Sequence, residues 1–172
     1  MNVKRKLIRT LAAAAAVPLI VLALPVAPAS AHGYVSAPPS RQAQCAAGTV
    51  SCGDIKYEPQ SVEGPKGLRR CDGGVARFAE LNDDTKGWHA TATGRTVTFN
   101  WVLTAAHRTA SWEYYIGNTR VGFVDGNNSV PPTAFSHTIN LGNVSGRQKV
   151  LAIWNIADTA NAFYSCIDLQ VS

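Results

Sequence analysis

A period-two alternation of apolar residues in the second half of the chain constrains the fold more than any other feature. Between positions 96 and 103 one parity is apolar throughout and carries Val97, Phe99, Trp101 and Leu103. Successive side chains of a β-strand point to opposite faces of its sheet, so this alternation predicts a strand with a buried face. Similar alternation begins at Trp112, at Phe135 and at Ile167.

These strands predict an all-β fold. Residues 150–156 are almost wholly apolar, which is typical of a central strand buried on both faces. About five strands at turn-punctuated intervals, with no strong helical period, indicate an antiparallel β-sandwich of the immunoglobulin or fibronectin III-like class. Residues 33–94 are rich in Gly, Pro, Ser and Gln and show little periodicity. We expect a long loop insertion there, between the first strand and the main strands, with a short helix near residues 75–81.

The N-terminal segment has the three parts of a secretory signal. Four basic residues precede an apolar run over residues 11–24, and the small-x-small run Ala29-Ser30-Ala31 follows it. The run is short for a membrane span, so we favour a signal peptide over an anchor. We predict a signal peptide over residues 1–31, cleavage after Ala31, export from the cell and a single domain over residues 32–172.

The charge of the remaining chain is close to neutral. All eleven acidic residues and twelve of the sixteen basic residues lie beyond the predicted signal, which leaves a net charge of +1. Nothing in this balance indicates binding to nucleic acid or to an anionic membrane.

Four cysteines follow the signal: Cys45, Cys52, Cys71 and Cys166. An even number in an exported protein favours two disulfides, and three pairings are possible. Proximity favours Cys45 with Cys52, which leaves Cys71 with Cys166. A cysteine metal site is the alternative, but the chain has no CxxC motif.

Cleavage after Ala31 would make His32 the first residue, and a terminal histidine offers a metal both its α-amine and its imidazole. Copper favours such nitrogen ligands, and one more imidazole would complete three nitrogens. The candidates are His89, His107 and His137. His137 shares the parity of the core residues, which favours a structural role, and His89 sits in a loop and favours a surface role. His107 follows a strand end, where ligand sites are commonly built, and is modestly favoured.

Four segments in order carry a family resemblance: HGYVSAPPSR at 32–41, YEPQSVEG at 57–64, WVLTAAHRTASW at 101–112 and DTANAFY at 158–164. With these segments behind a signal that ends at a histidine, the chain resembles the bacterial lytic polysaccharide monooxygenases of auxiliary activity family 10. The resemblance spans essentially all of residues 32–172.

The resemblance implies a role for each matching residue. His32 and His107 match the two histidines that bind one copper ion. Phe163 matches the aromatic residue at one axial side of the copper, Ala105 the small residue at the other, and Glu63 a nearby carboxylate that positions the oxygen species. The positions that match the flat substrate face, or that lie close to the copper, are Tyr57, Glu58, Thr104, Asp158 and Asn161.

The resemblance also implies the reaction. We expect a chitin-active, C1-oxidising enzyme that breaks β-1,4 bonds of crystalline chitin with O2 or H2O2 and an external electron donor, acting as a monomer. Three alternatives stay open: a non-catalytic chitin-binding protein, a cellulose-active relative and an extracytoplasmic copper carrier. The carrier is disfavoured because the only methionine is Met1, so the chain lacks a Met-rich copper motif.

Overall fold

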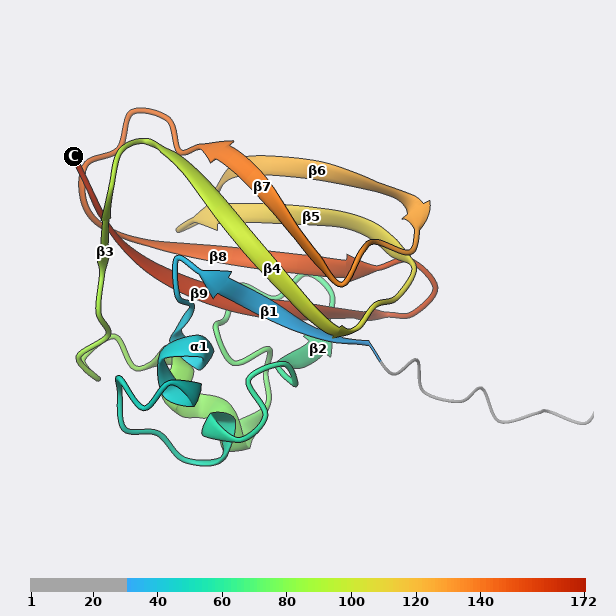
Figure 1. Ribbon diagram of the computed structural model, residues 1–172, viewed down its shortest axis with the longest axis horizontal. Coiled ribbons are helices and arrows are strands. Elements are labelled where there is room, and N and C mark those ends of the chain that lie inside the picture. Colours follow the sequence, from blue (N-terminus) through green and yellow to red (C-terminus); the bar gives the residue numbers. More distant parts are fainter. Residues whose placement is uncertain (1–30) are drawn as a thin grey trace, which may run out of the picture.

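The computed structural model describes residues 31–172, which form two β-sheets (Figure 1). The predicted signal peptide therefore lies, except for Ala31, outside the described residues. One sheet has the strand order β1-β4-β7, and the other has the order β2-β9-β8-β5-β6, with β3 also paired to β9. The strands are β1 (His32–Ala37), β2 (Glu63–Pro65), β3 (Thr91–Thr93), β4 (Thr96–Ala105), β5 (Thr109–Ile116), β6 (Thr119–Ser129), β7 (Ala134–Asn140), β8 (Gly146–Ile156) and β9 (Asn161–Val171).

The alternating segments form the predicted strands, and their apolar parity faces the space between the sheets. All four alternating residues of β4 are at most 3 % exposed. They pack with residues of β5, β8 and β9 into one core cluster, in which Trp101 donates from Nε1 to the hydroxyl of Tyr114 at 2.9 Å. β8 lies between β5 and β9, which explains why residues 150–156 are apolar at nearly every position. The predicted β-sandwich is confirmed.

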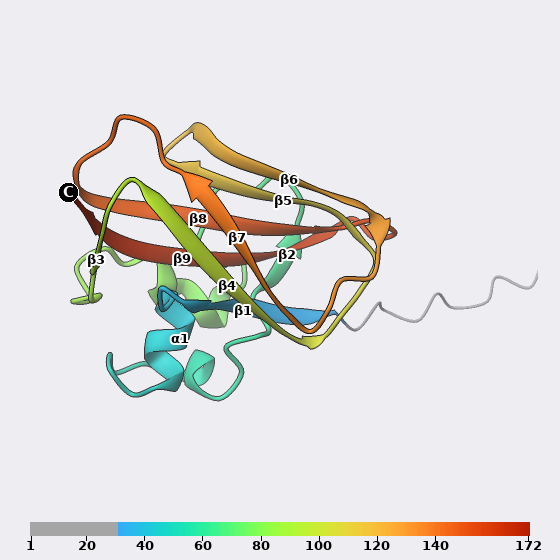
Figure 2. The same cartoon turned by 45° about the horizontal axis from the view of Figure 1, so that its top comes forward.

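The insertion between β1 and β4 covers the outer face of the larger sheet (Figure 2). It contains α1 (Arg41–Ala46), the 3-10 helices η1 (Asp54–Lys56) and η2 (Ala76–Asn82), and the short strands β2 and β3. Its apolar side chains form a second core cluster with β8 and β9, which includes Phe78, Leu81 and Tyr164. Both favoured disulfides are present, Cys45–Cys52 within the insertion and Cys71–Cys166 from the insertion to β9.

A buried arginine also fastens the insertion to β9. Arg41 is 1 % exposed and donates from Nε to the carboxylate of Asp168 at 2.8 Å. Its Nη1 donates to the carbonyl of Leu81, and the ring of Trp88 lies 5.1 Å from its guanidinium carbon. A buried charge is tolerated when it is paired and hydrogen-bonded, and each nitrogen of this guanidinium donates at least one hydrogen bond.

Some elements were not predicted. The helix α1 carries buried Gln42 and Gln44, so it lacks the apolar stripe by which a helix is recognised. The predicted helix near residues 75–81 is the 3-10 helix η2. The short pairing of β3 with β9 is parallel, in an otherwise antiparallel set of ladders.

In the part of the chain described, no helix is long and apolar enough to cross a membrane.

Candidate metal centre

Strand register brings His32 and His107 to the same end of the sandwich. His32 opens β1 and is paired with Ala105, the last residue of β4, so His107 lies only two residues beyond that pair. The hydroxyl of Thr109, the first residue of β5, donates to the carbonyl of His107 at 2.9 Å and holds the connecting loop. We call this end of the sandwich, where β1 starts and β4 ends, the histidine end (Figure 1).

A carboxylate already contacts one ring. Nε2 of His107 lies 2.8 Å from Oδ1 of Asp158, in the loop between β8 and β9. This hydrogen bond from His107 holds the pKa of Asp158 below its ordinary value. A metal bound at Nε2 would compete with Asp158 for this nitrogen.

Two packed aromatic rings lie next to His32. Phe163 of β9 is fully buried, and its ring centroid lies 6.2 Å from that of His32. The ring centroid of Trp154 in β8 lies 5.1 Å from that of Phe163, and Trp154 donates from Nε1 to the hydroxyl of Thr109 at 2.8 Å. Phe163 is thus a core residue that also borders the histidine end, and Ala105 borders it through its pairing with His32.

Glu63 reaches the same end through β2. The strand pairs with β9 so that Glu63 stands opposite Phe163. The side-chain amide of Asn161 donates to Oε1 of Glu63 at 2.8 Å, and both side chains are partly buried. The structure therefore brings Glu63, Phe163 and Asn161 together at the histidine end.

The remaining expected substrate-face residues are exposed to different degrees. Tyr57 follows η1 and is 81 % exposed, and Thr104 is exposed near the end of β4. Glu58 instead forms a two-pronged ion pair with Arg77 of η2. Arg77 has no role in the sequence-based interpretation, since 19 positions separate it from Glu58.

The other two histidines play no part at this end. His89 is exposed in the insertion. Nδ1 of His137 lies 2.7 Å from the hydroxyl of Tyr114, which confirms the hydrogen-bonded structural histidine expected from its parity. Its pKa is lowered from 6.5 to about 4 because burial disfavours the charged ring.

The donor set at the histidine end suits a metal that binds nitrogen. Within residues 31–172 no group of three or more His, Cys, Asp or Glu side chains could hold a metal. Two imidazoles therefore need a donor that is not a side chain, and the α-amine of a terminal His32 is one. Alanine and phenylalanine beside them add no donor atom. Such nitrogen-only sets with few axial ligands fit copper.

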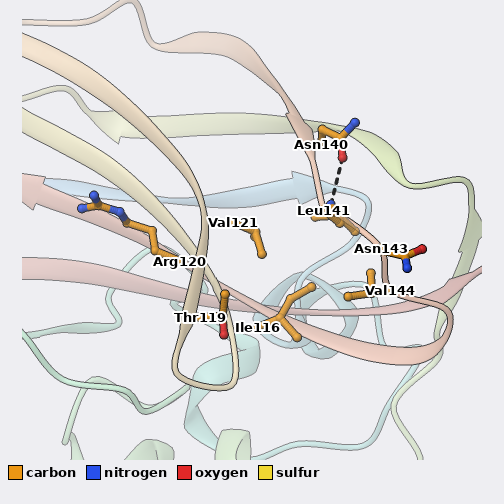
Figure 3. A pocket seen from close by; sticks show the side chains of 9 residues that line it. Ile116, Thr119, Arg120, Val121, Asn140, Leu141, Asn143 and Val144 are labelled. Atoms are coloured by element: carbon orange, nitrogen blue, oxygen red, sulfur yellow. Dashed lines mark hydrogen bonds between the residues drawn. The ribbon is translucent and has the colours of Figure 1, made fainter.

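A hollow of about 390 Å³ opens at the opposite end, between the β5–β6 turn and the β7–β8 loop (Figure 3). Its walls include Ile116, Val121, Leu141 and Val144, and Arg120 extends away from them. None of the expected site residues lines it. The candidate chemistry therefore sits on an exposed end of the sandwich and not in this hollow.

Fold and site together define a class: a small β-sandwich whose candidate metal ligands lie on an exposed end suited to a solid surface. The sequence profile of the family described as "Lytic polysaccharide mono-oxygenase, cellulose-degrading" matches residues 32–169. The chain belongs to the lytic polysaccharide monooxygenases of auxiliary activity family 10.

Relatives and solved structures agree with this membership. A lytic chitin monooxygenase of Streptomyces ambofaciens is 61 % identical over 158 residues, covering 92 % of each chain. The neutron structure of a Jonesia denitrificans lytic polysaccharide monooxygenase is 47 % identical, with a TM-score of 0.79 over 82 % of this chain and 100 % of that one. A Bacillus amyloliquefaciens protein in complex with Cu(I) is 30 % identical, with a TM-score of 0.69 over 82 % of this chain and 100 % of that one.

Proposed function

We propose that this protein is a secreted, copper-dependent monooxygenase that oxidises crystalline chitin at C1 and so breaks its β-1,4 bonds, using O2 or H2O2 and an external electron donor. It acts as a monomer and binds one copper ion. The observation that carries this proposal is the register of β1 on β4, which sets His32 opposite Ala105 and two residues from His107.

Processing is part of the proposed site. While residues 1–31 are attached, the nitrogen of His32 is an amide and does not chelate. Cleavage after Ala31 turns it into an amine whose ordinary pKa of about 7.7–8.0 lets a metal displace its proton near neutral pH. The exported protein thus acquires its third nitrogen only when the signal is removed.

The chain's own residues position the reaction. Copper, when bound by His32 and His107, supplies the one-electron chemistry that activates the oxidant. Asp158 contacts the ring of His107, and Asn161 orients the carboxylate of Glu63 toward the same end. Phe163 fills the space beside His32 with an apolar ring, which keeps one side of the site free of competing ligands.

An exposed end suits an insoluble substrate, because a crystalline polysaccharide does not enter a cleft. We favour chitin over cellulose because the Streptomyces ambofaciens relative and a 36 % identical Enterococcus faecalis relative are both lytic chitin monooxygenases. The family description names cellulose degradation, so cellulose is the substrate against which chitin must be compared.

The test incubates the processed, copper-loaded protein with β-chitin or cellulose and ascorbate, and analyses the soluble products by mass spectrometry. We expect oligosaccharides ending in aldonic acids from chitin and few or none from cellulose. Binding to chitin without any oxidised product would support the non-catalytic alternative instead.

A matched variant tests the terminal nitrogen. One extra alanine before His32 leaves every side chain in place but removes the amine. We expect copper affinity, measured by calorimetry, to fall by more than about a hundredfold, since loss of an outer partner of a metal ligand alone costs about 10–100-fold. Unchanged copper affinity and turnover in the extended protein would refute the proposed ligand set.

A further inference from the structure

A tight turn lies beside the His107 loop and contains none of the expected site residues. Between β5 and β6, Ser111 pairs with Asp125 whereas Thr109 pairs with Ser129. β6 therefore carries two more residues than β5 over this stretch, which makes a bulge at the histidine end. Bulges of this kind often lie next to active sites, where they redirect side chains.

Two residues of the bulge adopt the left-handed backbone conformation. Asn127 and Asn128 have φ values of 49° and 52°, in a region that asparagine tolerates better than other non-glycine residues. Gly126 approaches Thr109 so closely that an added Cβ would lie 2.4 Å from the carbonyl oxygen of Thr109. The close approach therefore requires glycine at position 126.

Contacts from both sheets fix the turn. The backbone N–H of Asn127 donates to Asp125, and the hydroxyl of Ser129 donates to the carbonyl of Gly126, each at 2.8 Å. Nη1 of Arg108, the residue after His107, donates to the carbonyl of Asn128 at 2.8 Å. The carbonyl of Thr133, which follows the turn, accepts from the N–H of Leu103 in β4 at 2.7 Å. The turn is thus bonded to the His107 loop, and the residue after it is bonded to β4.

This rigid turn presents an apolar side chain to solvent. Val130 is 61 % exposed and is followed by Pro131 and Pro132, which restrict the backbone further. Asn127 and Asn128 are exposed beside it and carry amides that both donate and accept hydrogen bonds. Pyranose rings present C–H faces and polar edges, so a fixed apolar residue flanked by amides matches a sugar chain.

The turn and the insertion lie on opposite sides of the histidine end. In both views the end of β6 lies on one side of the start of β1, and the insertion that carries Tyr57 lies on the other (Figure 1; Figure 2). We propose that the 127–132 turn is a second edge of the polysaccharide-binding face and contacts sugars on the side of the cleaved bond away from Tyr57. This inference rests on the proposed function and assigns its substrate a second set of contacts.

The test measures binding of copper-loaded protein to β-chitin, without reductant, by depletion isotherms. Val130→Ser removes the apolar contact, and Asn127→Gly removes the amide while keeping a residue that tolerates positive φ. We expect Val130→Ser to raise the dissociation constant about fivefold, as partial loss of one buried aliphatic side chain implies. We expect Asn127→Gly to raise it by about the same factor, as loss of one hydrogen bond implies. Phe123→Ser is the matched control, because Phe123 is 51 % exposed nearer the middle of β6.

The outcomes separate the two proposals. If the wild type oxidises chitin and both turn variants bind it as tightly as the wild type, the second edge is refuted and the proposed function stands. If the wild type binds chitin but releases no oxidised product, and the turn variants bind more weakly, the second edge stands and the proposed function falls. If the wild type binds no polysaccharide, both fall. Unchanged thermal unfolding of the variants shows that the fold is intact.

Discussion

At the scale of single residues, the side chain of Asn161 has a defined partner in Glu63. The resemblance implied a place for Asn161 on the substrate face or close to the copper, and its amide donates to Glu63 at 2.8 Å. Asn161 and Glu63 lie on paired strands, with Pro65 opposite Asn161 and Phe163 opposite Glu63. The hydrogen bond therefore restrains the carboxylate of Glu63, and Asn161 has two candidate roles: to hold this carboxylate or to contact the substrate.

Replacing Asn161 distinguishes these two roles. We expect Asn161→Ala to slow the oxidation of chitin about tenfold, because a misplaced carboxylate costs rate, and to change chitin binding by less than about twofold. Rates of product release and depletion isotherms measure the two quantities, with Asn143→Ala in the β7–β8 loop as the control. A large loss of binding with an unchanged rate per bound enzyme would instead assign Asn161 to the substrate.

At the scale of elements, the short strand β2 is the one that carries Glu63 to the site, and its place depends on a close backbone approach. A Cβ on Gly64 would lie 1.8 Å from the carbonyl oxygen of Gly73. Only glycine fits there, so the strand and the adjacent loop are packed against each other through bare backbone.

Gly64→Ala tests this packing. We expect the free energy of unfolding to fall by about 2 kcal/mol, since an overpacked buried site must shift its backbone. Gly94→Ala is the control, because its added Cβ meets nothing within 4 Å, and its effect should stay within about 0.5 kcal/mol. Denaturant unfolding followed by fluorescence measures both, and equal stability of the two variants would contradict the close approach.

Elements also show what sequence predicts and what it does not. β4 was predictable because every second residue is buried and apolar, and β8 because its central residues are buried on both faces and are nearly all apolar. β6 was not, since most of Thr119–Ser129 is exposed or half-buried and leaves little alternation. Within the site, a motif predicted His32 and His107. The contacts of Asp158 with His107 and of Asn161 with Glu63 join positions 51 and 98 residues apart, and only the folded chain places them together.

At the scale of the whole molecule, the core contains a titratable group that links stability to pH. His137 is held neutral, with its pKa lowered from 6.5 to about 4 by burial. Because Trp101 donates to the Tyr114 hydroxyl, that hydroxyl is free to donate to Nδ1 of His137, and protonation of Nδ1 would remove this acceptor.

The direction in which pH changes the free energy of unfolding follows from proton binding by the folded and unfolded chains. Between about pH 6.5 and pH 4 the unfolded chain binds a proton at this residue that the folded chain does not, so stability falls as pH falls through this window. We expect His137 to lower the free energy of unfolding of the wild type by about 2 kcal/mol over this pH window, a figure reduced for the partial exposure of its ring. Denaturant unfolding at pH 6.5 and 4.5 should show a smaller loss in His137→Gln. His89 is exposed, so His89→Gln should lose as much stability between pH 6.5 and pH 4.5 as the wild type. An equal loss in the wild type and both variants would refute the role of His137 in this pH dependence.

The direction of β9 has a practical consequence. The strand starts at Asn161 beside the histidine end and runs to Val171 at the other end, where the C-terminus lies (Figure 1). Eleven residues of extended chain span over about 30 Å. A bead or electrode linked to Ser172 would hold the molecule at its C-terminus, with the histidine end turned outward. Immobilised in this way, the protein keeps the histidine end clear for a fibre brought to it.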